Sequence, residues 1–216
     1  MKTSYATVVL VMTLILGGCA STDITAFKDP AFKTVTFRRI LVVANTSDLG
    51  ERQNIESRMV ESFQKAGIFA MQSLELFPPT RSFSGEQKIE LLKNAKLDAY
   101  ISINIGESGV EQTYIPPTQS TTKTEGTVRV NDNSAQYKEN STTTTDGGRT
   151  LSKPWANFST SLNDVSSGAL VWIASSSTGG NAYATINTVR QSYCDKVVTQ
   201  LRKDGLVEGY PWLLKP

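Results

Sequence analysis

Phe37-Arg38-Arg39-Ile40-Leu41-Val42-Val43-Ala44-Asn45 is the stretch that decides the fold. Its middle is apolar at every position from Ile40 to Ala44 and is rich in β-branched residues. A strand that is apolar on both faces is typical of the centre of a sheet that is covered on both sides. The run therefore predicts the first central strand of an α/β domain that opens at Val35.

Two further strands follow, each preceded by a helix. The first helix carries an apolar stripe at helical spacing, and the second begins with a capping box formed by Ser84 and Gln87. The predicted elements are, in order, a helix over 51–66, a strand over 68–76, a helix over 84–95 with Ile89 and Leu92 facing inward, and a strand over 98–105. This order predicts a β-α-β-α-β layer, whose crossovers are right-handed.

The second half of the chain predicts antiparallel hairpins and a last helix. Residues 116–150 are rich in Thr, Ser, Asn and Gly, so they form either a disordered loop or a polar hairpin of about 120–130 with 134–145. Alternating residues predict another hairpin of 154–162 with 169–175. A helical stripe over 182–203 closes the domain, and residues 206–216 form an aromatic tail. The predicted fold class is α/β, a single domain over 35–205.

The N-terminus reads as a targeting segment. A single Lys2, a short apolar run over 6–16 and Leu16-Gly17-Gly18-Cys19-Ala20 have the three parts of a secretory signal peptide over 1–18. The run is too short to span a bilayer. The segment resembles a bacterial lipobox, in which a peptidase cuts before the cysteine and its sulfur carries a diacylglyceryl group. This resemblance implies a membrane anchor at Cys19.

The anchor implies a location. Two or more acyl chains hold a protein stably on a bilayer. Residue 20 is Ala rather than the Asp that favours inner-membrane retention in Gram-negative bacteria, so in such a host the resemblance implies the periplasmic face of the outer membrane. The polar residues 19–34 predict a tether between the lipid and the domain.

Composition narrows the possible chemistry. The 22 basic and 20 acidic residues nearly balance, so no nucleic-acid partner is expected. The chain has no histidine, which removes the commonest general base and metal ligand. No metal site and no cofactor are expected. Cys194 is the second of two cysteines and is either a reactive thiol or a small buried residue.

A candidate ligand site follows the first strand. Its members are polar and lie at the strand mouth where α/β sheets usually bind ligands: Asn45, Ser47, Asp48 and Glu51. The alternative is helix capping, with Ser47 or Asp48 as N-cap and Glu51 in the first turn. A Ser-Lys pair such as Ser152-Lys153 is the remaining catalytic arrangement, and Pro154 disfavours a helical placement of it.

The order of elements resembles the curli-secretion-lipoprotein and TolB-N-terminal-like superfamily of periplasmic α/β domains. The resemblance covers 35–205 and rests on the lipobox together with RRILVVAN at 38–45, FPP at 77–79, DAYISINI at 98–105 and GALVWIA at 168–174. It implies a non-enzymatic interaction or assembly module with an envelope protein partner; the polarity of 116–150 argues against a pore. The alternatives are a small-ligand-binding module near Asp48 and a weak cell-wall hydrolase.

Overall fold

The computed structural model describes residues 18–117, 121–131, 134–144 and 147–209. These residues fall into two compact units. We call the unit formed by 18–111 and 153–209 the body, and the unit within 112–152 the arm. Residues 1–17 of the predicted signal peptide (1–18) and residues 210–216 of the predicted aromatic tail (206–216) lie outside the described residues.

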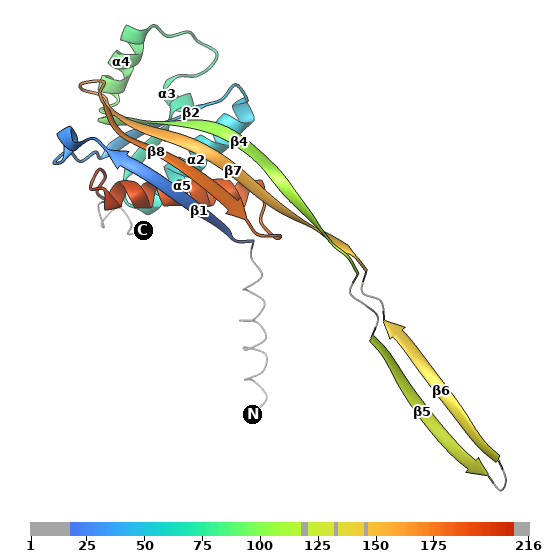
Figure 1. Ribbon diagram of the computed structural model, residues 1–216. Helices are drawn as coiled ribbons and strands as arrows, with labels where there is room; N and C mark the ends of the chain where they lie inside the picture. The colour runs from blue at the N-terminus through green and yellow to red at the C-terminus, as the bar shows by residue number, and fades with distance from the viewer. Residues whose placement is uncertain (1–17, 118–120, 132–133, 145–146, 210–216) are drawn as a thin grey trace, which may run out of the picture. The chain divides into compact units, whose positions relative to one another are not determined.

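The body is built on a six-stranded mixed sheet with the strand order β1-β8-β7-β4-β2-β3 (Figure 1). Strand β2 is an interior strand of this sheet, and it pairs in parallel with the edge strand β3 on one side and with β4 on the other. Strand β8 pairs antiparallel with both β1 and β7. The strands are β1 (Ala20–Lys28), β2 (Arg39–Asn45), β3 (Phe69–Gln72), β4 (Ala99–Ile115), β7 (Arg149–Asp164) and β8 (Leu170–Gly180).

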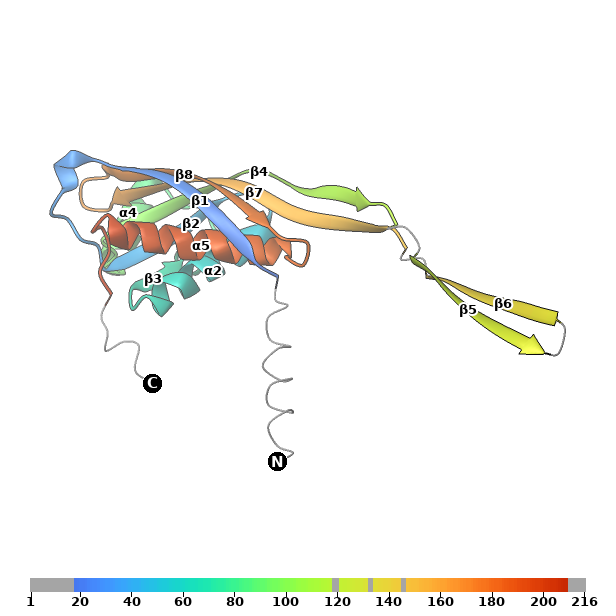
Figure 2. The same ribbon diagram turned by 60° about the horizontal axis from the view of Figure 1, so that its bottom comes forward.

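Helices cover both faces of the central strand. Figure 2 shows α2 (Leu49–Lys65) and α5 (Ile186–Lys203) on one side of the sheet. Ile40, Val42 and Ala44 of β2 are buried in the core that these helices share. Leu41 and Val43 belong to a second apolar cluster on the opposite face, with α3 (Ser73–Leu76) and α4 (Gly85–Asn94). The predicted central strand is thereby confirmed.

Helix α5 is fixed to the sheet through an aromatic stack. The Tyr193 ring stacks on Phe158 of β7 with ring centroids 3.9 Å apart, and its hydroxyl lies 2.6 Å from the hydroxyl of Thr160. The α/β fold class is confirmed: a layered sheet is continued by antiparallel hairpins and closed by a C-terminal helix.

The predicted tether is wrong over Ala20–Lys28, because these residues form β1 at the edge of the sheet. Ala20 pairs with Gly180 and Lys28 with Trp172 of β8. The inward Thr22 hydroxyl is satisfied by Thr178 at 3.0 Å and by Ser192 of α5 at 2.9 Å. A polar strand can pack here because its buried hydroxyl has hydrogen-bond partners. Residues 30–32 form the short 3-10 helix η2 (Pro30–Phe32).

Two other boundaries and the orientation of one side chain differ from prediction. The strand predicted over 68–76 ends at Gln72, and α3 begins at Ser73. Helix α5 begins at Ile186 rather than at 182, since Thr185 caps it with Thr188 in a capping box. In α4 the Ser84–Gln87 capping box is confirmed and Leu92 is buried, but Ile89 is 50% exposed.

The arm is an antiparallel hairpin of β5 (Thr121–Asn131) and β6 (Ser134–Thr144). The pairing runs from Thr121↔Thr144 to Asn131↔Ser134. Of the two alternatives that the sequence left open, the polar hairpin of about 120–130 with 134–145 covers nearly the same residues. Strand β4 begins in the body and ends in the arm, and strand β7 begins in the arm and ends in the body.

Candidate functional site

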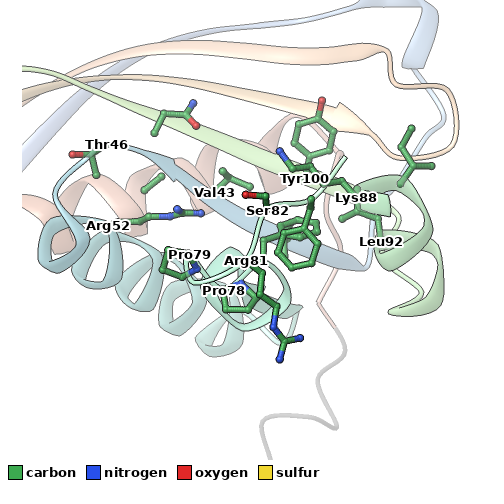
Figure 3. Close-up of a pocket in the computed structure, with 16 residues that line it drawn as sticks. Val43, Thr46, Arg52, Pro78, Pro79, Arg81, Ser82, Lys88, Leu92 and Tyr100 are labelled. Carbon is green, nitrogen blue, oxygen red and sulfur yellow. The ribbon is translucent and has the colours of Figure 1, made fainter. Parts of the chain in front are cut away.

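The body contains a cavity of about 750 Å³ on the face of the sheet that carries α4 (Figure 3). The residues that line the cavity come from β2, the first turn of α2, the connection over 77–83, α4 and the start of β4. Parallel α/β sheets bind ligands where successive crossovers leave a strand to opposite sides. Strand β2 is at such a point, because β3 and β4 flank it. The cavity runs along the face of β2 and reaches the carboxyl end of this strand at Asn45 and Thr46, where a ligand site is expected.

The floor of the cavity is apolar. Leu41 and Val43 of β2, Leu92 of α4 and Tyr100 of β4 line it, and Phe77 closes one side. Phe77 packs edge-to-face on Phe83, with ring centroids 5.7 Å apart and an interplanar angle of 64°. Pro78 and Pro79 lie between these rings in sequence and restrict the backbone of the connection. The connection is thus a stiff wall.

The charged groups of the cavity are all cationic. Arg52, Arg81 and Lys88 line it, and its lining contains neither aspartate nor glutamate. Arg81 and Lys88 are exposed and take part in neither of the ion pairs found among the described residues. Arg52 differs, since its guanidinium already pairs with Glu56. The cavity therefore combines an apolar floor with two cations that form no ion pair within the described part of the chain.

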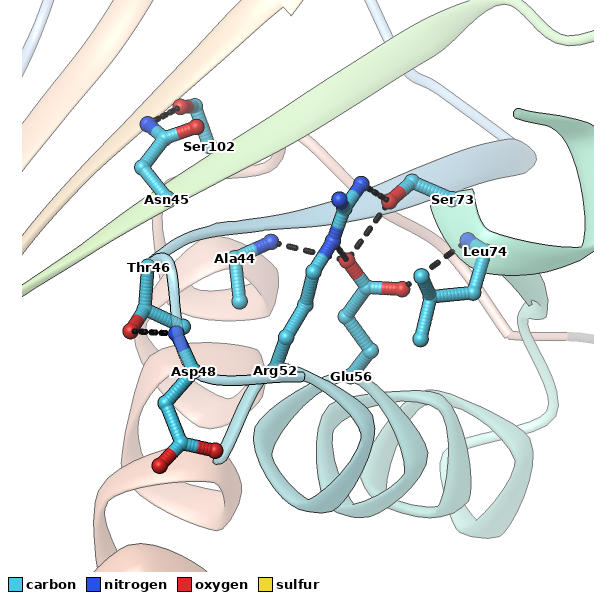
Figure 4. Close-up of polar contacts among 9 residues, drawn as sticks. All are labelled: Ala44, Asn45, Thr46, Asp48, Arg52, Glu56, Ser73, Leu74 and Ser102. Atoms are coloured by element: carbon cyan, nitrogen blue, oxygen red, sulfur yellow. Dashed lines mark hydrogen bonds and ion pairs between the residues drawn. The ribbon is translucent and has the colours of Figure 1, made fainter. Parts of the chain in front are cut away.

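Glu56 joins the elements that frame the cavity (Figure 4). One carboxylate oxygen accepts hydrogen bonds from the Ala44 amide at 3.0 Å, from Arg52 Nε at 3.1 Å and from the Ser73 hydroxyl at 2.6 Å. The other accepts from the Leu74 amide at 3.2 Å. Arg52 also donates to Ser73 at 2.7 Å. Strand β2, helix α2 and helix α3 are tied to one buried carboxylate, which sets the position of Arg52.

The four predicted ligand residues do not converge on one point. Asn45 lines the cavity and donates to Ser102 at 2.7 Å and to Asn104 at 2.9 Å. Asp48 is the N-cap of α2 and accepts from the Glu51 amide at 2.9 Å.

The carboxylate of Glu51 pairs with Arg190 of α5 at 2.7 Å, and Ser47 is exposed. Neither Ser47, Asp48 nor Glu51 is part of the cavity lining. Asp48 and Glu51 thus have the places that the helix-capping alternative gave them, as the N-cap and in the first turn of α2. The cavity residues that sequence reasoning missed are Arg52, Arg81 and Lys88. The Pro78-Pro79 pair, which also lines the cavity, was the sequence feature that could have indicated a rigid connection there.

The two cysteines lie in opposite surroundings. Cys194 is buried in α5, and burial, then the neighbouring Asp195, raise the pKa of its thiol. A protonated, enclosed thiol is a small apolar side chain rather than a nucleophile. Cys19 is exposed, and its carbonyl accepts a hydrogen bond of 2.9 Å from the Asn181 amide.

The described residues lack two other features. They contain no cluster of His, Cys, Asp or Glu that could hold a metal ion. Within the same part of the chain, every helix is too short or too polar to cross a membrane.

Comparison with known proteins gives a loose structural likeness. No protein-family model and no curated protein matches the chain. It is similar to the PelC dodecamer from Paraburkholderia phytofirmans, at 14% identity and a TM-score of 0.49 over 84% of this chain and 97% of that one. It is similar to lipoprotein GNA1162 from Neisseria meningitidis, at 14% identity and a TM-score of 0.40 over 77% and 99%. It is also similar to a PDZ domain protein from Parabacteroides distasonis, at 10% identity and a TM-score of 0.33 over 89% of this chain and 38% of that one. TM-scores below 0.5 decide nothing about function.

Proposed function

We propose that this chain is a lipid-anchored lipoprotein of the bacterial cell envelope that acts as a non-enzymatic interaction module. The observation that carries the proposal is the cysteine that follows Leu16-Gly17-Gly18, since it lies directly before the first strand of the body. Cys19 is exposed and β1 starts at Ala20. A lipid on this sulfur would hold the body close to the bilayer surface. Ala20 after the cysteine favours the outer membrane.

A binding role is favoured over catalysis by the chemistry of the side chains. The chain lacks histidine, and the thiol of Cys194 is buried. The carboxylates of Glu56 and Asp48 accept hydrogen bonds from backbone amides, and Glu56 also accepts from the Arg52 and Ser73 side chains. For the alternative of a weak cell-wall hydrolase, we expect purified protein to leave peptidoglycan intact in a zymogram; clearing would contradict a purely binding role.

The anchor is tested by envelope fractionation of cells that carry the chain or Cys19→Ser, combined with crosslinking in vivo. We expect the unaltered chain in the outer-membrane fraction, with a mass that shows cleavage before residue 19 and two or three acyl chains. Cys19→Ser should keep its leader and lose the acyl mass. A bare residue 19 in the mature chain would contradict the anchor. Specific crosslinked proteins that depend on Cys19 would identify the partner.

A second function is favoured by the cavity: the body binds a small ligand at the mouth of the sheet. The predicted site near Asp48 moves toward Asn45 and Arg52, because these residues line the cavity whereas Asp48 caps α2. A cavity of about 750 Å³ is within the size range of small-molecule sites. Arg52→Ala should therefore weaken ligand binding more than Asp48→Ala, and equal effects would contradict the relocation.

A further inference from the structure

We propose that this cavity binds an amphipathic anion, a molecule with an apolar acyl or aromatic body and one phosphate, carboxylate or sulfate group. The inference rests on the second proposed function, that the cavity is a ligand site, and names the class of ligand. It does not depend on the lipid at Cys19.

The apolar half of the ligand follows from the floor. Ile89 of the lining is 50% exposed, and Val43, Phe77 and Tyr100 are only partly buried members of the second apolar cluster. A ligand that covered these groups would remove apolar surface from water at about 25 cal/mol per Å². A purely polar ligand would gain nothing from this floor.

The anionic half follows from uncompensated positive charge. Arg81 lies on the stiff connection and Lys88 on the second turn of α4, so they flank the cavity from two different elements. Neither side chain has a carboxylate partner among the described residues. An anionic group that reaches either cation forms charge-assisted hydrogen bonds, which are about twice as strong as neutral ones.

Other ligand classes fit less well. A metal cation would meet three cationic side chains and no carboxylate in the lining. A neutral sugar would leave Arg81 and Lys88 without an anionic partner. Arg52 is held by Glu56 and Ser73, so it contributes a positioned guanidinium edge rather than a mobile charge. The cavity thus distinguishes the charge and the hydrophobicity of its ligand at once.

The test is calorimetric titration of the full chain in phosphatidylcholine nanodiscs, with empty nanodiscs subtracted. The probes are octyl phosphate, octyl glucoside, which has the same tail without charge, and inorganic phosphate, which has the charge without the tail. We expect one saturable site for octyl phosphate and at least tenfold weaker binding of both other probes. The proposal is overturned if octyl glucoside or inorganic phosphate binds the site as tightly as octyl phosphate. It is also overturned if octyl phosphate does not bind. Sugar binding without octyl phosphate binding would keep the ligand site and reject the anion.

Variants locate the site. Arg81→Ala with Lys88→Ala should weaken octyl phosphate at least tenfold and leave octyl glucoside unchanged. The matched control is Lys93→Ala, an exposed cation of the same helix that does not line the cavity. An unchanged affinity in the double variant would overturn the proposal. The three-probe comparison uses the unaltered chain, so it decides the question even where the double variant fails to fold.

One added arm distinguishes a membrane lipid from a soluble amphiphile. The titration is repeated in nanodiscs that contain phosphatidic acid. Competition that weakens octyl phosphate binding identifies the bilayer as a source of the ligand. An unchanged affinity identifies a soluble source, and both results uphold the amphipathic anion.

Discussion

Glu56 has no exposed side-chain surface, and its surroundings explain how the fold accommodates a charge there. Taking a carboxylate out of water costs several kcal/mol unless it is paired and its oxygens accept hydrogen bonds. Arg52 supplies the opposite charge one helical turn earlier, and two backbone amides with the Ser73 hydroxyl complete the set. The carboxylate thus replaces its water with four protein donors.

We predict that Glu56→Ala lowers the free energy of unfolding by about 3–5 kcal/mol, because the change strands the Arg52 charge and the buried donors. Urea unfolding followed by circular dichroism measures the loss. Glu61→Ala is the matched control, an exposed glutamate on the same helix that should change stability by less than about 0.5 kcal/mol. Equal losses in the two variants would show that the Glu56 network contributes no more than a surface charge.

Lys96 follows α4 with φ of 54°, in the left-handed region that favours glycine. We predict that Lys96→Gly raises the free energy of unfolding by about 0.5–1 kcal/mol, since relief of the left-handed strain exceeds the added entropy of the unfolded chain. The same change at Lys93, inside α4, should lower it by about 1 kcal/mol. Thermal unfolding of both variants tests the opposite signs, and a loss at residue 96 would contradict the strain.

The sequence predicts the region of the site better than its members. Asn45 was expected at the strand mouth and does line the cavity. Arg81 and Lys88 could not be identified, because a cation on a connection or a helix surface has the same pattern whether it faces a cavity or solvent. Ile89 was expected to be inward but is half exposed, since it lines the cavity rather than the core.

At the scale of elements, β1 shows where periodicity misleads. Thr22, Ile24 and Ala26 face inward, and the outward positions carry Asp23, Thr25 and a Phe27 that is 62% exposed. A hydroxyl on the buried side and an aromatic ring on the outer side reverse the usual pattern of a half-buried strand. The buried hydroxyl network with Thr178 and Ser192, which sequence alone does not reveal, makes this arrangement stable.

We predict that Thr25→Cys with Ser175→Cys forms a disulfide, because these residues are register partners and both are exposed. Directly opposed residues of antiparallel strands lie within the Cα separation that a disulfide spans. Mass spectrometry under oxidising conditions measures the bond. The control is Thr25→Cys with Ser177→Cys, two residues out of register. Equal yields in both pairs would mean that 20–28 behaves as the tether the sequence suggested.

The central elements were predictable for the opposite reason. Strand β2 is apolar from Ile40 to Ala44 because both of its faces are buried there, so nothing in its pattern competes with a strand. The strand predicted over 68–76 was too long because Ser73 and Leu74 continue a sequence pattern that is compatible with a strand. The helix that replaces it depends on Glu56, seventeen positions earlier than Ser73, which is a tertiary contact.

We predict that the body folds without the arm. Among the residues whose burial the structure describes, none of the buried core lies within 112–152. Gly109 of β4 lies against Trp155 of β7, so the two strands are adjacent where the arm begins and an Asn-Gly turn can join them. Replacing 112–152 with that turn should leave the melting temperature within about 2 °C, since the buried apolar area is unchanged. A fall of more than about 5 °C, measured by circular dichroism, would assign the arm a share of the stability.

At the scale of the whole body, the proposed anchor selects one end of the sheet. Val165 after β7 donates to the Asp98 carbonyl before β4, so these strands are antiparallel. With β7–β8 and β1–β8 also antiparallel, Cys19 lies at the end of the sheet where β2 and β4 have their carboxyl ends. A lipid on Cys19 would therefore turn the mouth of the sheet toward the bilayer.

This orientation predicts which side chains meet lipid. Asn181 donates its amide to Cys19 and accepts from the Tyr183 amide at 3.0 Å, so Tyr183, 66% exposed, lies beside the anchor. Leu170 is 49% exposed at the other end of β8, roughly 30 Å away at the rise of a strand. A photoreactive phenylalanine in place of Tyr183 should form lipid adducts in membranes, and the same residue in place of Leu170 should not. Adducts at both positions in equal yield would mean that the body lies flat or turns freely, since a lipid at residue 19 can hold only one end of the sheet against the bilayer.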